Sequence, residues 1–172
     1  GVYGVQTGVA RALNIPLANI RVIGHYMGGG FGAKLSHGKY SVMAALLAKK
    51  TGRPVRLFLS REQVCMSMGN RPGNTITLKA GVKKDGTLVA LQSNVVGSGG
   101  AYSDGGTGGV DYVIRELYAC PNVRCENASV YINAGPQRAF RAPGHPQGAW
   151  ALEIMLDALA AKLGMDPVAL RL

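Results

Sequence analysis

The 172-residue chain is long enough for a domain with its own hydrophobic core, and its 47% hydrophobic residues and 25 glycines indicate a globular, loop-rich protein. No stretch approaches the roughly 20 consecutive apolar residues of a membrane helix. The formal charge of +10 suggests an anionic partner, but the basic residues are scattered without interleaved aromatic rings, which disfavours nucleic-acid binding. Three irregularly spaced cysteines do not make a disulfide framework, so we expect reduced thiols in a cytoplasmic protein.

The first third of the chain is predicted to hold two helices and two strands. Apolar residues at helical spacing predict a helix over 6–13 that ends before Pro16. The apolar run over 20–23 predicts a short strand, and a second helical pattern spans about 39–50. Alternating apolar residues over 54–59 predict another strand.

The middle of the chain is predicted to form an antiparallel hairpin. Two alternating runs, at 75–82 and 87–96, flank Asp85-Gly86, a pair typical of tight hairpin turns. The glycine-rich stretch over 97–109 predicts an irregular loop after the second strand.

The last third is predicted to contain one more strand, over 123–132, and an amphipathic helix over about 147–163. A further helix is expected at Pro167, with Asp166 as its cap. Because helices mix with a hairpin and no regular βαβ repeat is visible, we predict an α+β fold, with a mixed or antiparallel sheet packed with helices.

The loop Gly28-Gly29-Gly30-Phe31-Gly32-Ala33-Lys34 is the first candidate site. Its bare backbone, single cation and following helix would suit a phosphate or another anionic, oxygen-rich cofactor. It is no P-loop, because Ala33-Lys34-Leu35 lacks the last glycine and the metal-binding hydroxyl. It also lacks the acid expected about 20 residues after a dinucleotide fingerprint. A connection without a ligand remains the alternative.

A second candidate site is the loop over 137–147, which precedes the long predicted helix. It carries Arg138 and Arg141, whose planar guanidinium groups can bind phosphate or oxo groups, and prolines that make it rigid. The alternative is a surface loop with ordinary helix capping. His145 is expected to be a helix-start residue, since no other histidine is spaced from it as in a metal site.

Taken together, five segments occur in an order that resembles the molybdenum-cofactor-binding subunits of the xanthine dehydrogenase / aldehyde oxidase family. They are MGGGFGAK at 27–34, TGRPVRLFLSREQ at 51–63, YACPN at 118–122, AFRAPGHPQ at 139–147 and LGMDP at 163–167. The resemblance covers nearly the whole chain. It implies a molybdenum hydroxylase, which oxidises aldehydes or heteroaromatic rings and passes electrons to iron–sulfur clusters and often FAD.

The resemblance also implies which residues contact the molybdenum–molybdopterin cofactor. The family's cofactor-binding positions match Gly29, Gly30, Phe31 and Gly32 in the first loop and Arg141 and Ala142 in the second. Phe31 would exclude water, while main-chain N–H groups and Arg141 would stabilise anionic oxygens. A cytosine dinucleotide form of the pterin is compatible with the resemblance.

Two positions of the expected substrate pocket depart from the family's purine pattern. Leu35 stands where purine hydroxylases have a glutamate, and Pro143 where they have a phenylalanine. Ala142 stands where carbon monoxide dehydrogenases have a copper-binding cysteine. We therefore expect an aldehyde or another N-heterocycle as substrate, and neither xanthine nor carbon monoxide.

No catalytic residue is expected within this chain, because the family's general-base glutamate lies near the C-terminal end of the subunit, in a motif that Glu62, Glu116, Glu126 and Glu153 do not match. No metal ligand is expected from its side chains. Glu153 is expected to brace loop or helix contacts. Because Gly1 is no methionine and the chain ends early in a predicted helix, we expect residues 1–172 to be one module, truncated at both ends, of a larger molybdopterin-binding domain.

Such a module would be inactive alone. Its expected partners are the remaining segments or subunits of the hydroxylase, including those with iron–sulfur clusters and FAD, and a small-molecule substrate, with neither nucleic acid nor membrane. The main alternative is a non-catalytic, partner-binding module that keeps the fold. A third interpretation is a basic nucleic-acid-binding domain, which predicts that DNA or RNA binding depends steeply on salt.

Overall fold

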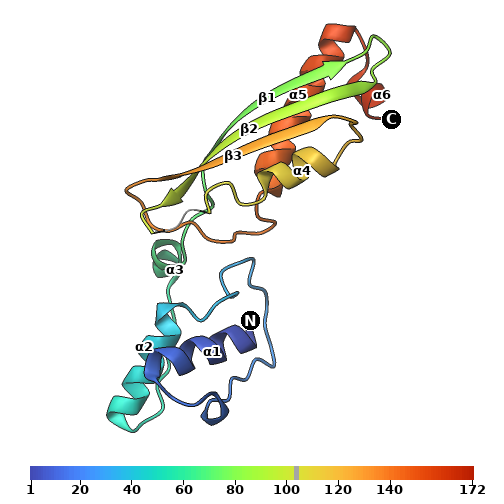
Figure 1. The fold of residues 1–172 in the computed structure, drawn as a ribbon. Coiled ribbons are helices and arrows are strands. Elements are labelled where there is room, and N and C mark those ends of the chain that lie inside the picture. The colour runs from blue at the N-terminus through green and yellow to red at the C-terminus, as the bar shows by residue number, and fades with distance from the viewer. Residues whose placement is uncertain (103–104) are drawn as a thin grey trace. The chain divides into compact units, whose positions relative to one another are not determined.

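The computed structural model describes residues 1–102 and 105–172, and its contacts divide the chain into two units, Gly1–Gly69 and Asn70–Leu172 (Figure 1). The first unit contains helices α1 (Val2–Leu13), α2 (Gly38–Thr51) and α3 (Arg61–Ser67), with a short 3-10 turn, η1 (Leu17–Asn19). The second unit contains strands β1 (Asn74–Val82), β2 (Leu88–Gly100) and β3 (Val123–Tyr131), with helices α4 (Val110–Glu116), α5 (His145–Leu163) and α6 (Pro167–Arg171).

The first unit confirms both predicted helices. α1 ends at Asn14, whose left-handed φ of 51° lets its N–H bond back to Ala10 and Arg11, and α2 ends at Gly52 with φ 65°. The two helices pack against each other. Within residues 1–69, all of which the structure describes, Val9 alone is buried.

Both strands predicted for the first unit are wrong. Residues 20–23 and 54–59 form neither strand nor helix. The alternation over 54–59 is nevertheless real, because Val55, Leu57 and Leu59 are half-buried while their neighbours are exposed. A strand also needs a neighbouring strand for its N–H and C=O groups, and no segment of residues 1–69 provides one.

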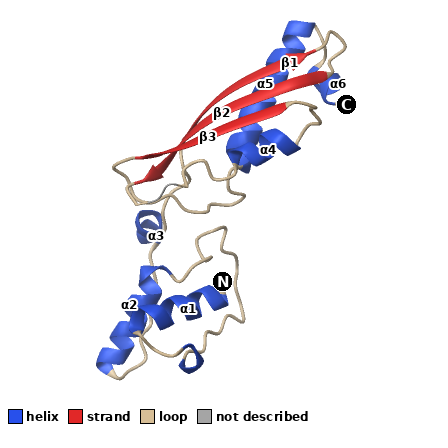
Figure 2. Ribbon diagram, in the orientation of Figure 1, coloured by secondary structure: helices blue, strands red, loops and turns tan. Residues whose placement is uncertain are grey.

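The second unit is built on a three-stranded mixed sheet in the order β1-β2-β3 (Figure 2). β1 and β2 form the predicted antiparallel hairpin, with Asn74 opposite Gly97, and its turn is closed by a 3.0 Å bond from the Gly86 N–H to the Lys83 carbonyl. β3 lies parallel to β2, and α4, which was not predicted, belongs to the connection between them. The expected α+β fold with a mixed sheet and helices is therefore confirmed.

The core of the second unit lies between the sheet and helices α4 and α5 (Figure 1). Side chains of β2 alternate, so that Leu91, Ser93 and Val95 are buried while Gln92 and Asn94 are exposed. The helices contribute fully buried apolar residues to the same core: Val110, Ile114 and Leu152.

The glycine-rich stretch after residue 96 is only partly a loop, because β2 continues to Gly100. Its glycines allow backbones to touch. A Cβ on Gly97 would lie 2.3 Å from the carbonyl of Gly106, and one on Gly100 would lie 2.4 Å from the carbonyl oxygen of Gly135. Residues 103–104 of the predicted loop lie outside the described residues.

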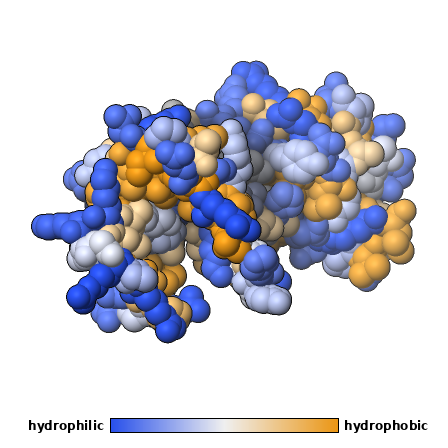
Figure 3. Space-filling model, turned by 90° about the horizontal axis from the view of Figure 1, so that it is seen from below, coloured by the Kyte–Doolittle hydropathy of each residue, from blue (hydrophilic) through white to orange (hydrophobic). Residues whose placement is uncertain are grey.

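The surface mixes polar and apolar patches, as the space-filling view of one face shows (Figure 3). Among the exposed apolar side chains of the first unit are Tyr26 (100% exposed) and Phe58 (85%). None of the helices in the described part of the chain is both long and apolar enough to cross a membrane.

Candidate cofactor site

The glycine loop of the first unit contains a left-handed turn. The Ala33 N–H donates to the Gly30 carbonyl at 2.9 Å, and the two central residues, Phe31 and Gly32, have φ of 51° and 103°. Positive φ at both central positions is the geometry of a type I′ turn. It suits Gly32, but a bulky residue such as Phe31 adopts it only at a cost of about 1–3 kcal/mol.

The ring of Phe31 folds back over the main chain of the same loop. A Cβ on Gly29 would lie 2.7 Å from Cε2 of that ring, whereas a Cβ on Gly28 would meet nothing within 4 Å. Gly29 thus makes room for the ring, while Gly28 leaves its backbone open to approach. Phe31 is nevertheless 65% exposed.

The far end of this loop is fixed against helices α1 and α2. A Cβ on Gly8 would lie 2.1 Å from Nδ1 of His37, so the imidazole packs directly on the backbone of α1. The Tyr40 hydroxyl of α2 reaches the Ala33 carbonyl at 3.4 Å. Leu35, between these anchors, is 64% exposed and is therefore available to line a pocket.

The second loop, which precedes α5, also contains a left-handed residue. Ala142 has φ 52°, and its carbonyl accepts from the His145 N–H at 3.1 Å. Nδ1 of His145 lies 3.0 Å from the Pro143 carbonyl, in keeping with its predicted place at the start of the helix. Gly144 packs on the backbone near α4, where a Cβ would lie 2.4 Å from the carbonyl carbon of Gly109.

Arg71, which lies outside the second loop in the sequence, is hydrogen-bonded to it. Its Nη2 donates to the carbonyls of Phe140 (2.6 Å) and Arg141 (2.7 Å), and its Nη1 donates to Oε1 of Gln147 (3.1 Å). The guanidinium also lies over the Phe140 ring, 5.0 Å from its centroid. Gln147 in turn donates to the Pro72 carbonyl at 3.3 Å.

Sequence reasoning missed Arg71, which lies 69 to 76 residues from its partners along the chain. The predicted residues themselves fall into two groups. Gly29, Gly30, Phe31, Gly32 and Leu35 lie together within the first unit. The second unit holds the other three, Arg141, Ala142 and Pro143.

The two loops fit an anionic, oxygen-rich cofactor. Each presents main chain in a conformation that costs free energy and is held by defined contacts, as is common at functional sites. Among residues 1–102 and 105–172, no oxygen accepts a hydrogen bond from the Ala142 N–H. In the same part of the chain, no three His, Cys, Asp or Glu side chains form a group that could hold a metal ion.

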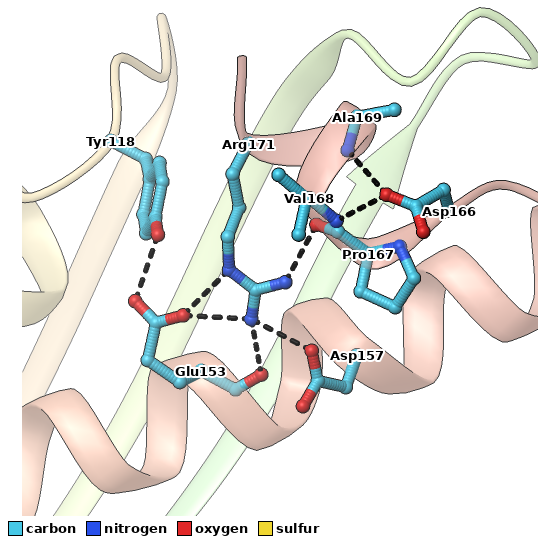
Figure 4. A network of polar contacts seen from close by, with 8 residues as sticks. All are labelled: Tyr118, Glu153, Asp157, Asp166, Pro167, Val168, Ala169 and Arg171. Carbon is cyan, nitrogen blue, oxygen red and sulfur yellow. Dashed lines mark hydrogen bonds and ion pairs between the residues drawn. The ribbon is translucent and has the colours of Figure 1, made fainter.

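Glu153 belongs to a bracing network on α5, as predicted (Figure 4). Its carboxylate accepts from the Tyr118 hydroxyl at 2.8 Å and from Nε of Arg171 at 2.7 Å. Arg171 also pairs with Asp157 at 2.8 Å, which ties α6 to α5. Burial, followed by the hydrogen bond to Glu153, raises the pKa of Tyr118 above its usual value.

Comparison with known proteins shows the family to which the chain belongs. The model of the molybdopterin cofactor-binding domain family matches residues 1–172. One relative, a probable xanthine dehydrogenase component from Bacillus subtilis (strain 168), is 38% identical over 172 residues, which are 98% of this chain and 23% of that protein.

Two solved structures share the fold. The aldehyde oxidoreductase from Desulfovibrio gigas has a TM-score of 0.86 at 33% identity, over 99% of this chain and 19% of its own. Quinoline 2-oxidoreductase from Pseudomonas putida 86 has a TM-score of 0.85 at 30% identity, over 97% of this chain and 22% of its own. The chain thus spans about a quarter or less of the length of these relatives. With the family model matching throughout, the chain belongs to the molybdopterin cofactor-binding domain family of the molybdenum hydroxylases.

Proposed function

We propose that residues 1–172 are one module of a larger molybdenum-binding subunit, and that its two left-handed loops contact the molybdenum cofactor. One observation supports this proposal: strained, left-handed backbone occurs in the same two loops that the sequence resemblance assigns to the cofactor. Among the described residues, three non-glycine residues have positive φ: Asn14, Phe31 and Ala142. Asn14 ends a helix, where this conformation is ordinary, but the other two lie in the two loops that the sequence assigns to the cofactor.

In this proposal the module binds and shields the cofactor, which supplies the redox chemistry. In the first loop, the Phe31 ring excludes water, and the bare main chain of Gly29, Gly30 and Gly32 approaches anionic oxygens. In the second loop, Arg141 and Ala142 offer the cofactor a cation and a main-chain N–H donor. The pterin released in the experiment described below also shows whether it carries a cytosine nucleotide.

The proposed substrate is an aldehyde or an N-heterocycle other than xanthine. The Leu35 side chain is apolar and cannot hydrogen-bond the polar edge of a purine, and Pro143 lacks the flat aromatic ring that the resemblance places in a purine pocket. Relatives named for aldehyde and quinoline oxidation support this class, although another relative is named for xanthine. Ala142 offers no sulfur to copper, which disfavours carbon monoxide as the substrate.

Activity is proposed to require further protein. The general base is proposed to lie outside residues 1–172, and the electrons are proposed to leave through iron–sulfur and FAD-containing domains or subunits. We expect residues 1–172 alone to oxidise no aldehyde. Turnover of benzaldehyde by this piece alone would contradict the proposal.

The cofactor contacts are tested in the complete subunit, co-produced with its partner subunits. Phe31→Leu and Arg141→Met are each expected to lower molybdenum and released pterin per protein at least threefold, and Arg124→Met, which changes an exposed arginine on β3, is the control. Wild-type metal content in both site variants would reject the assignment. Absence of metal and pterin from the wild-type complex would favour a non-catalytic module instead.

The substrate class is tested with benzaldehyde, quinoline and hypoxanthine on the same complex. We expect kcat/KM for benzaldehyde or quinoline to exceed that for hypoxanthine at least 100-fold, about 2.7 kcal/mol of transition-state discrimination. A preference for hypoxanthine would overturn the substrate assignment and leave the cofactor assignment intact.

A further inference from the structure

Arg71 and the second loop form one hydrogen-bonded assembly within the second unit. The Arg138 N–H donates to the Asn70 carbonyl at 2.9 Å, so the segment before Arg71 is paired with the loop as well. Gln147 bridges Arg71 and the Pro72 carbonyl, which links the same segment to the first turn of α5. The guanidinium therefore cannot move without disturbing contacts on both sides.

The carbonyls that Arg71 holds determine where the opposite N–H groups point. The described residues contain no cis peptide bond, and in a trans peptide the C=O and N–H bonds point in nearly opposite directions. Because the Arg141 carbonyl faces Nη2 of Arg71, the N–H of Ala142 points away from Arg71. The Phe140 carbonyl fixes the direction of the Arg141 N–H in the same way.

Arg71 also helps to hold Ala142 in its strained conformation. The peptide before Ala142 is fixed by Arg71, and the carbonyl after it is fixed by the His145 N–H. A residue with φ 52° flanked by two fixed peptides cannot relax to negative φ without breaking one of these bonds.

We propose that Arg71 is a positioning residue of the cofactor site, which acts through the Phe140 and Arg141 carbonyls to direct the Ala142 N–H toward the bound cofactor. This inference rests on the proposed function, which assigns Arg141 and Ala142 to the cofactor. Arg71 itself contacts the opposite side of the loop, so its influence reaches the cofactor only through the main chain.

The main test is Arg71→Lys in the complete enzyme, because lysine keeps the charge but cannot hold both carbonyls and Gln147 in one planar fork. We expect at least half of the wild-type molybdenum content, a shifted electron paramagnetic resonance spectrum of the partly reduced molybdenum centre, and a kcat lower by about 10- to 100-fold with KM within threefold. Arg124→Lys on β3 is the matched control and should leave all three unchanged.

Ala142→Gly separates relief of strain from direction of the N–H. Glycine adopts φ 52° freely, so the double variant Arg71→Lys/Ala142→Gly should recover the thermal stability lost in Arg71→Lys. The spectrum should remain shifted, because in the double variant the Phe140 and Arg141 carbonyls still lack the guanidinium that holds them. Recovery of both spectrum and kcat together with stability would mean that Arg71 only supports the fold, and would overturn the proposal.

A second variant tests the role of Arg71 if Arg71→Lys does not bind molybdenum. Gln147→Met keeps both carbonyl bonds and removes the bonds that Gln147 makes with Nη1 of Arg71 and with the Pro72 carbonyl, so at most a small shift of the same spectrum is expected. A wild-type spectrum in the loaded fraction of Arg71→Lys, or a shift in Gln147→Met as large as that in Arg141→Met, would overturn the role of the two carbonyl bonds. If Arg141→Met also has wild-type metal content and spectrum, the cofactor assignment itself has failed; if Arg141→Met shifts them and Arg71→Lys does not, only the present inference has failed.

Discussion

The ring of Phe31 rests on the backbone of Gly29, where an added Cβ would lie 2.7 Å from Cε2 and 3.1 Å from Cζ. Gly29 also has φ 133°, which side-chain-bearing residues rarely adopt. The glycine therefore determines where the aromatic ring lies, in addition to exposing main chain. This relationship turns a glycine-rich motif into a specific geometric requirement.

Gly29→Ala should displace the Phe31 ring and lower the molybdenum retained by the complete subunit at least threefold. It should also lower the free energy of unfolding by about 1–2 kcal/mol, because alanine is strained at this φ. Gly28→Ala is the matched control for the free energy of unfolding, since its Cβ would meet open space in the protein itself. Metal analysis and chemical denaturation test this prediction. Equal free energies of unfolding for the two variants would contradict it.

Two glycines of α1 should respond to alanine with opposite signs. Alanine favours a helix by up to about 1 kcal/mol relative to glycine, so Gly4→Ala, whose Cβ would lie 3.5 Å from the Leu35 carbonyl oxygen, should be neutral or stabilising. Gly8→Ala should destabilise, because its Cβ would lie 2.1 Å from the His37 ring. Melting temperatures test this, and a stabilised Gly8→Ala would show that His37 moves at little cost.

Ser93 is fully buried, and among the described residues its hydroxyl has no hydrogen-bond partner. Ser93→Ala should therefore raise the free energy of unfolding by about 1 kcal/mol. Ser98 of the same strand is the contrasting position, since its hydroxyl accepts from the Gly73 N–H at 3.0 Å. Ser98→Ala should lower stability by about 1 kcal/mol, as urea denaturation would measure. A loss in Ser93→Ala would indicate a buried water on Ser93.

Tyr118 should make stability depend on alkaline pH. Its pKa is raised in the folded protein, chiefly by burial and then by Glu153, so its contribution is present below the unfolded pKa near 10.0 and is lost as pH rises through the folded pKa. Tyr118→Phe should lower stability at pH 7 and make its decline above pH 10 shallower. Denaturation at both pH values tests this, with Tyr112→Phe on α4 as control. An unchanged slope would contradict the assignment.

Local patterns predicted much of the second unit correctly. The Asp85-Gly86 turn and the alternation beside it are contained in one short segment, and the structure confirms the hairpin. α3 could also have been predicted, because Ser60 and Gln63 form a capping box. The parallel pairing of β2 with β3 could not, since it depends on a connection longer than twenty residues.

The candidate site was predictable only where its chemistry is local. Phe31 and Arg141 stand out within glycine- and proline-rich loops, whereas Arg71 acts on residues 69 to 76 positions away. Composition also could not predict that Phe31 and Ala142 are left-handed, because neither residue type favours that conformation. The contacts that impose it form only in the folded chain.

The scarcity of buried side chains in the first unit has a consequence for amide hydrogen exchange. With Val9 as the single buried residue of 1–69, local opening there should cost far less than opening of β2, whose Leu91 and Val95 lie in the core. A ligand that binds only the folded glycine loop raises the free energy of local unfolding by mass action. We therefore expect cofactor loading to slow exchange most strongly around Phe31 and Leu35, and to leave β2 nearly unchanged.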